Sequence, residues 1–278
     1  MPKTLIRRYL SAACAALAGS VVFTASACAA DPEPPAPPDS SAKPTVVLVH
    51  GAFADASSWN GVIAALQREG YPTIAPADPL RDVAGDAAYI ASVVRSIPGP
   101  VLLVGHSYGG AIITNAARDA ANARGLVYLA AFAPDTGESA LGISQRFPET
   151  LIGKSLSPRI FPLPDGAAGT DLYVDPARFR EVFAQDVPAD RAATMAATQR
   201  PITETAFGGP SGDPAWKSLP SWYLVSTEDH AIHPDAQRFM AQRLGAKEIR
   251  EVNSSHAVAV SNPDIAADLI RTAARSIA

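Results

Sequence analysis

Cysteine is scarce in this 278-residue chain: Cys14 and Cys28 are the only two, and both lie within the first 30 residues. From residue 45 onward there is consequently no thiol for catalysis, no cysteine-based metal site and no internal disulfide. The stability of that region must come from the burial of apolar side chains, and hydrophobic residues make up 47% of the chain.

Positive charge is not in excess either. The chain has 23 Lys and Arg residues against 27 Asp and Glu residues, which gives a formal net charge of −4. A nucleic-acid-binding surface needs clustered positive charge, so nucleic acid is not an expected partner. The length and the globular composition fit one large α/β domain or two small ones.

The N-terminal segment has the composition of an export signal. Basic residues among the first eight precede an Ala-rich apolar run from about residue 9 to residue 27, and small residues suit cleavage after residue 27 or residue 30. We therefore expect residues 1–30 to be a signal peptide and the protein to be exported, either secreted or periplasmic. A retained membrane anchor is the alternative, although Ser and Thr residues interrupt the run.

Two further features precede the folded domain. The residues from Ala25 to Cys28 are similar to a bacterial lipoprotein signal, so a membrane tether through a lipidated Cys28 is a second interpretation. Residues 31–44 are rich in proline, which predicts an extended linker because proline disrupts helices and sheet ladders. We place the folded domain at residues 45–278.

Strand and helix patterns alternate along that domain. Short apolar runs rich in β-branched residues predict strands at 45–50, 71–77, 101–104, 124–134, 221–229 and 248–253. Apolar residues at helical spacing predict helices at 57–70, 85–97, 108–122, 234–245 and 262–277. This order indicates an α/β fold with a mostly parallel central sheet and helices on both faces, in which chemistry gathers beyond the C-terminal ends of the strands.

The alternation breaks over residues 135–216, which mix loop and short helical patterns. We expect this insertion to form a helical cap over the strand ends. Its apolar side chains either line a pocket or form the cap's own small core. These side chains are Phe147, Ile152, Ile160, Phe161, Leu172, Tyr173, Phe179 and Phe183.

One serine occupies a position suited to a nucleophile. In "VLLVGHSYGG", Ser107 stands between Gly105 and Gly109, directly after a predicted strand and before a predicted helix. Glycines on both sides allow a sharp strand-to-helix turn that exposes the serine hydroxyl. The alternative is an ordinary turn between a strand and a helix, and a nucleophile also needs a base, an acid and an oxyanion site.

The base should be a histidine with a pKa near neutrality. His256 follows the last predicted strand, in a loop that can return to the serine. His106 lies inside the elbow, directly before Ser107, and its side chain is expected to point away from the site. His50 belongs to the loop after the first strand. His230 and His233 have the spacing of a metal pair, but no carboxylate or thiol set completes such a site.

The acid should lie at the end of a strand close to the histidine loop. Glu228 and Asp229 end the strand before the histidine loop, and Asp135 ends the strand after the elbow helix, so the residues alone leave three candidate acids.

Two backbone N–H groups should bind the oxyanion. Tyr108, after the serine, supplies one of them. Gly51 lets the loop after the first strand approach the elbow, where Ala52 or Phe53 can supply the other.

From about residue 46 to its C-terminus, the chain resembles the α/β-hydrolase superfamily, and within it the branch of plant methylesterases, hydroxynitrile lyases and related bacterial esterases. The segments that carry the resemblance are "LVHGAF", "GHSYGG", "VYLAAFAPDTGES", "STEDHAIHPDAQ" and "SSHAV". In that branch the triad acid stands eight residues before a glutamine. The resemblance therefore implies Asp229, eight residues before Gln237, as the acid, and Ala52 with Tyr108 as the oxyanion pair.

The candidate triad and the resemblance together indicate a carboxylesterase-type serine hydrolase that works through an acyl-enzyme with no metal or organic cofactor. The apolar side chains of the expected cap suggest small to medium hydrophobic esters as substrates. Lyases of the branch carry a threonine and a lysine where this chain has Gly51 and Ala257, which disfavours a carbon–carbon lyase. Two more functions would fit the same fold, namely a non-catalytic ligand-binding protein and a cofactor-free haloperoxidase-like activity.

Overall fold

The structure, a computed structural model, describes residues 43–278. The expected signal peptide (residues 1–30), the expected lipidation site at Cys28 and residues 31–42 of the predicted linker lie outside the described residues. The first strand begins at Thr45. None of the helices between residues 43 and 278 is long and apolar enough to cross a membrane.

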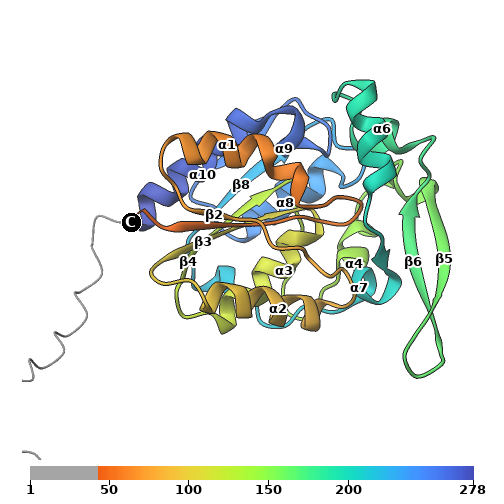
Figure 1. Cartoon of the computed structure of the whole chain (residues 1–278), viewed down its shortest axis with the longest axis horizontal. Helices are drawn as coiled ribbons and strands as arrows, with labels where there is room; N and C mark the ends of the chain where they lie inside the picture. Colours follow the sequence, from red (N-terminus) through yellow and green to blue (C-terminus); the bar gives the residue numbers. More distant parts are fainter. Residues whose placement is uncertain (1–42) are drawn as a thin grey trace, which may run out of the picture. The chain divides into compact units, whose positions relative to one another are not determined.

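Six parallel strands form the central sheet, as the alternating patterns predict (Figure 1). Their spatial order is β2-β1-β3-β4-β8-β9, and every neighbouring pair is parallel. The strands are β1 (Thr45–Val49), β2 (Thr73–Ile74), β3 (Val101–His106), β4 (Ala123–Leu129), β8 (Ser221–Ser226) and β9 (Ile249–Val252). Strand β2 is shorter than the predicted 71–77 because Pro72 and Pro76, on either side of it, have no N–H to donate to a ladder.

Successive side chains of a strand pack against different helical layers. Val46 and Leu48 of β1 join one buried cluster, and Val47 and Val49 join the other. The first layer contains α1 (Asn60–Arg68), α9 (Val258–Ser261) and α10 (Pro263–Ile277). The second contains α2 (Val83–Arg95), α3 (Tyr108–Ala116) and α8 (Pro234–Arg243). In Figure 1, α1 and α10 lie on one side of the sheet and α2 and α3 on the other. Each fully buried Val or Leu stabilises the fold by about 1.5–3 kcal/mol.

Local sequence signals set several helix ends. The Asp82 side chain accepts a hydrogen bond from the Gly85 amide at 2.6 Å and caps α2. Pro234 and Pro263 occupy the first positions of α8 and α10, where a missing N–H costs nothing. Gly245 ends α8 with a φ of +61°, as its place after the predicted helix suggests.

The chain between β4 and β8 forms the insertion expected from residues 135–216, and it lies beyond the carboxyl ends of the central strands (Figure 1). It contains the predicted short helices, and also a three-stranded antiparallel sheet of order β5-β6-β7 that the sequence patterns did not predict. The helices are α4 (Ala140–Ser144), α5 (Phe179–Phe183), α6 (Ala189–Thr198) and α7 (Glu204–Gly208). The strands are β5 (Leu156–Pro162), β6 (Ala168–Val174) and β7 (Ile202–Thr203).

Prolines obscured the β5–β6 hairpin in the sequence. Pro158 and Pro162 lie within β5, which is an edge strand and therefore tolerates missing N–H donors. The connection between the strands contains Pro164-Asp165-Gly166, a turn sequence, and Gly166 has a φ of +85°. The cap is therefore a mixed helix and sheet insertion.

Candidate active site

Ser107 lies in a strained turn between β3 and α3. Its φ of 55° and ψ of −126° are rare for a residue with a side chain, and such strain persists only where the surroundings enforce it. The Ser107 carbonyl accepts hydrogen bonds from the amides of Gly110 and Phe132, both at 3.0 Å, which hold the turn in place. The sharp strand-to-helix elbow expected from the sequence is present.

Glycines are required around this elbow because backbone passes too close for a Cβ. A Cβ on Gly105 would lie 2.6 Å from the Gly109 carbonyl oxygen, and one on Gly109 would lie 2.4 Å from the Val49 carbonyl oxygen. A Cβ on Gly51 would lie 2.5 Å from the Cβ of Ser107. Gly51 therefore brings the loop after β1 against the serine, as its position in the sequence suggested.

His256 and Asp229 form a buried pair. The Nδ1 atom of His256 lies 2.7 Å from Oδ2 of Asp229, and both side chains are almost completely buried. A carboxylate can only accept, so Nδ1 carries the hydrogen. In the neutral ring, Nε2 is then an unprotonated acceptor, which is the form that a general base requires.

The other two candidate acids lie elsewhere. Glu228 is exposed, because adjacent residues at a strand end point in opposite directions. Asp135 is bonded to Lys217 at the surface, and the hydrogen bond from that ammonium group lowers the pKa of the carboxyl. Of the three carboxylates that the residues alone left open, Asp229 is the one in contact with His256.

Gln237 contacts Asp229, although the sequence motif indicated only its spacing of eight residues from that aspartate. Its side chain is fully buried, and its Nε2 donates to Oδ2 of Asp229 at 2.7 Å. The amides of Ala231 and Ile232 donate to Oδ1 of the same carboxylate at 2.7 and 2.9 Å. Together with His256, four donors converge on one buried carboxyl group.

His106 does not point away from the site, contrary to expectation. Its Nε2 donates to the backbone carbonyl of His256 at 2.8 Å, and the two ring centroids are 4.7 Å apart. The expectation failed because the sharp elbow turns the residue before Ser107 toward the histidine loop. Complete burial, with a smaller contribution from His256, lowers the pKa of His106 to about 3. His106 therefore stays neutral, and its hydrogen bond to the His256 carbonyl holds the histidine loop in place.

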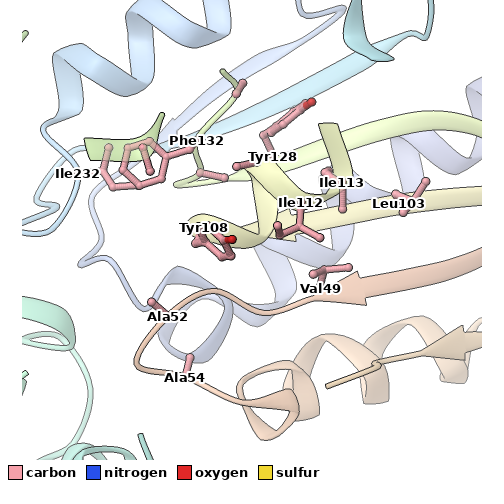
Figure 2. Packing of buried hydrophobic residues seen from close by; sticks show 14 of the residues in the cluster. Val49, Ala52, Ala54, Leu103, Tyr108, Ile112, Ile113, Tyr128, Phe132 and Ile232 are labelled. Atoms are coloured by element: carbon pink, nitrogen blue, oxygen red, sulfur yellow. The ribbon is translucent and has the colours of Figure 1, made fainter. Parts of the chain in front are cut away.

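Two backbone amides at the strand ends are available for an oxyanion. Among residues 43–278, the amides of Ala52 and Tyr108 donate to no protein group, whereas the Phe53 amide donates to the Arg200 carbonyl at 2.8 Å. Ala52 and Tyr108 lie beyond the end of β1 at the same edge of the sheet (Figure 2). Of the two residues proposed for the first loop, Ala52 is thus the one with a free N–H.

The loop carrying Ala52 is fixed by His50. The Asp78 amide donates to Nε2 of His50 at 3.0 Å, so the hydrogen must be on Nδ1, which donates to the Gly51 carbonyl at 2.9 Å. Burial lowers the pKa of His50 and keeps the ring neutral. His50 is therefore a structural residue that orients the Gly51–Ala52 peptide.

The cap contacts the histidine loop directly through Phe183. The Phe183 ring stands edge-on to His256 with the centroids 4.8 Å apart, and the Phe183 carbonyl accepts from the Ala257 amide at 3.0 Å. The Phe183 ring also stands edge-on to the rings of His106 and Phe53, with centroid distances of 6.2 and 6.4 Å. The cap therefore forms one wall around the candidate base.

Asp186 adds a second link between the cap and this loop. Its carboxylate accepts from the Ser254 hydroxyl and the Ser255 amide, both at 3.0 Å. Burial alone would raise the pKa of Asp186, but the hydrogen bonds from Ser255 and neighbouring hydroxyls outweigh it and lower the pKa. Gln185 donates to the Glu228 carbonyl at 2.6 Å, so one cap segment holds the loops of both His256 and Asp229.

A cavity of about 450 Å³ opens where these elements meet. Ser107, His256, Ala52 and Tyr108 all line it, and its walls are largely apolar and come mostly from the cap. The wall residues include Phe132, Leu141, Phe147, Pro148, Ile152, Leu156, Leu172, Ile202, Phe207 and Ile232, with Ser144, Gln145, Glu149, Thr150 and His233 as polar members. The volume falls within the range of ligand pockets.

The cap side chains singled out in the sequence divide between two roles. Phe147, Ile152 and Leu172 line the cavity. Phe179 and Phe183 are buried and pack against each other with centroids 5.0 Å apart, so they form the cap's own core. The three others lie outside the cavity wall, and they are Ile160, Phe161 and Tyr173. Both expected roles are therefore filled.

Residues 43–278 contain no group of three or more His, Cys, Asp or Glu side chains that could hold a metal ion. The Nδ1 atom of His230 bonds the Glu181 carbonyl at 2.9 Å, and that of His233 accepts from the Asp235 amide at 3.2 Å. His230 thus bonds to the cap, and His233 bonds within the first turn of α8.

Comparison with known proteins agrees with this geometry. A sequence model of the alpha/beta hydrolase family matches residues 46–269. The chain belongs to this family.

Relatives of this family member carry names of hydrolases and esterases. The alpha/beta hydrolase nvfD of Aspergillus novofumigatus is 27% identical over 84% of this chain and 97% of its own. The pyrethroid hydrolase of Sphingobium wenxiniae is 26% identical over 81% of this chain and 85% of its own. Methylesterase 8 of Arabidopsis thaliana is 26% identical over 70% and 75% of the two chains.

Solved structures share the fold. Polyneuridine aldehyde esterase superposes with a TM-score of 0.71 at 18% identity, covering 83% of this chain and 99% of that one. A methylesterase from Arabidopsis superposes with a TM-score of 0.69 at 19% identity, covering 84% and 99%. The predicted family and fold are thus confirmed, and a plant methylesterase is among the proteins with similar sequences.

Proposed function

We propose that this protein is an exported carboxylesterase-type serine hydrolase that cleaves hydrophobic esters through an acyl-enzyme. Ser107 is the proposed nucleophile, His256 the general base and then acid, and Asp229 the residue that orients and charge-stabilises the histidine. The amides of Ala52 and Tyr108 are the proposed oxyanion donors. No metal or organic cofactor takes part in the proposed reaction.

One observation carries the proposal. His256 lines the same cavity as Ser107, and its Nδ1 lies 2.7 Å from Oδ2 of the buried Asp229. The strained conformation of Ser107 adds support, because backbone strain of this kind is concentrated at functional sites. The names of the relatives support ester hydrolysis as the reaction class.

The proposed chemistry proceeds in two halves. His256 Nε2 takes the proton of the Ser107 hydroxyl as its oxygen attacks the ester carbonyl, and the two amides stabilise the resulting oxyanion. The imidazolium returns the proton to the leaving alcohol as the carbon–oxygen bond breaks, which leaves the acyl group on Ser107. Water then attacks the acyl-enzyme by the same route and releases the acid.

The cavity supports a small to medium hydrophobic ester. Its volume of about 450 Å³ lies toward the lower end of the range of small-molecule pockets, which is about 300–1,000 Å³. Phenyl and aliphatic walls favour uncharged acyl or alcohol groups of this size. Export, and the alternative of a lipid tether at Cys28, follow from the N-terminal sequence alone and are part of the proposal.

The test is active-site labelling of the full chain. We expect a fluorophosphonate probe to modify Ser107, as mapped by mass spectrometry, and p-nitrophenyl esters to be hydrolysed with an optimum chain length. The Ser107→Ala variant should lose at least about 10⁴-fold in kcat while its thermal unfolding is unchanged. Full turnover by that variant refutes the mechanism.

Two different results would point to another function. Absence of an adduct on the folded protein would favour a ligand-binding protein. Cyanide release from a cyanohydrin would favour the lyase, in spite of Ala257 standing where lyases carry a lysine.

A further inference from the structure

The carboxylate of Asp229 is held from every side by protein donors. Oδ1 accepts from the amides of Ala231 and Ile232, and Oδ2 accepts from His256 Nδ1 and Gln237 Nε2. Two of these donors are amides of the loop that follows Asp229 itself, and the third is the histidine that Asp229 orients. The fourth, Gln237, comes from a different element, helix α8.

The Gln237 side chain is completely buried, and all its polar atoms are engaged. Its Oε1 accepts from the Ser226 amide at 3.0 Å, at the end of β8, and its Nε2 also donates to the Ile232 carbonyl at 2.9 Å. The side chain therefore joins the end of β8, the loop after it and the carboxylate of Asp229.

We propose that Gln237 is a positioning residue, which fixes the carboxylate of Asp229 and through it the ring of His256. The inference rests on the proposed function and adds a residue to its machinery. Gln237 touches neither the cavity nor the reacting atoms, so it acts entirely through Asp229.

The physical reason lies in the freedom of an aspartate side chain. The terminal torsion of Asp is broad, so hydrogen bonds rather than rotamer preference set the plane of the carboxyl group. With Nε2 of Gln237 at 2.7 Å, Oδ2 has one orientation in which it satisfies both Gln237 and His256. Without that donor, Oδ1 keeps its two amide bonds but Oδ2 keeps only its bond to His256, so the carboxyl plane can shift and the imidazole ring shifts with it. For comparison, the loss of a hydrogen-bond partner that orients a metal-binding side chain typically changes activity by about 10–100-fold.

Two substitutions separate positioning from general stability. Gln237→Met removes both the donor and the acceptor at nearly constant size. Gln237→Glu keeps an acceptor for the Ser226 amide and, when protonated, an O–H donor toward Asp229. Gln242→Met is the matched control, because Gln242 is an exposed glutamine of the same helix.

We expect Gln237→Met to lower kcat for a p-nitrophenyl ester by about 10–100-fold, with KM changed by less than about threefold. The activity of Gln237→Glu relative to wild type at the same pH should be highest in acid and should fall as the pH rises. Two carboxyls 2.7 Å apart cannot both ionise without repulsion, so deprotonation pushes Asp229 out of place. The activity of Gln237→Met relative to wild type should be independent of pH.

A second readout needs no turnover. The proton on His256 Nδ1 should give a strongly downfield NMR signal in the wild type and in Gln242→Met, and a lost or shifted signal in Gln237→Met. If Gln237→Met has the kcat and the signal of Gln242→Met, the positioning role is wrong. If Gln237→Met does not fold, the pH dependence of Gln237→Glu decides alone, and a profile parallel to wild type overturns the proposal. A wild type that hydrolyses no ester contradicts the proposed function, whereas the proton signal still tests the positioning role.

Discussion

Gly51 offers the sharpest test of how the proposed oxyanion site is built. A methyl group added there would lie 2.5 Å from the Ser107 Cβ, 2.8 Å from the His106 carbonyl oxygen and 3.0 Å from the Tyr108 amide nitrogen. Gly51 is not among the glycines with positive φ, so the expected effect of Gly51→Ala is steric. Ordinary contacts of this kind exceed 3.4 Å, so the loop and the elbow must separate by about 1 Å.

That separation should affect catalysis more than folding. Displacing the Ala52 amide from the Tyr108 amide by about 1 Å is expected to lower kcat by about 100-fold. Overpacking of a close contact should lower the free energy of unfolding by about 1–3 kcal/mol. We would measure kcat with a p-nitrophenyl ester, the rate of labelling by a fluorophosphonate, and urea unfolding.

Gly208→Ala is the control, since the nearest atom to its added methyl group would be Leu141 Cδ2 at 4.0 Å. We expect kcat of this variant to stay within about twofold of wild type, and its stability not to fall, because alanine favours a helix over glycine by up to about 1 kcal/mol. Gly51→Ala with wild-type kcat and unchanged stability would refute the close approach of loop and elbow on which the oxyanion assignment depends.

Four further variants test other parts of the site. Asp229→Asn should lower kcat by about 10⁴-fold and Glu228→Gln by less than about twofold; the reverse order in steady-state kinetics would move the acid. His106 has a pKa of about 3 in the fold, below its unfolded value, so its contribution to stability is present above the unfolded pKa and is lost as the pH falls from neutrality toward 3. Urea unfolding at about pH 7 and pH 4 should show a loss about 3 kcal/mol larger in wild type than in His106→Gln, and equal losses would contradict this. Asp186→Ala removes the acceptor for the Ser255 amide, so labelling of the serine should slow by about 10-fold, and an unchanged rate would show that the cap does not hold the loop.

Local patterns in the sequence predicted much of the fold. Period-two and period-3.6 spacing of apolar residues depends only on near neighbours in the chain, which is why strands such as β3 and helices such as α10 lie close to their predicted ranges. Proline inside β5 cancelled the same signal, because a strand at the edge of a sheet tolerates residues that a central strand does not. The cap sheet was missed for that reason.

The elbow around Ser107 could also be predicted from the sequence, because the glycines that permit the turn lie within two residues of the serine.

The candidate acid could not be predicted from the residues alone. Glu228, Asp229 and Asp135 all end predicted strands, and only the resemblance to a family favoured Asp229 before the structure showed its contact with His256.

What the sequence determined by itself is therefore the parallel sheet with its helices and the elbow, since each depends on interactions between residues close along the chain. Only the tertiary structure decided which carboxylate meets His256, that His106 faces it, that Gln237 reaches Asp229, and which cap side chains line the cavity. These contacts join segments from different elements, and their geometry depends on how the sheet, helix α8 and the cap pack together rather than on any local pattern.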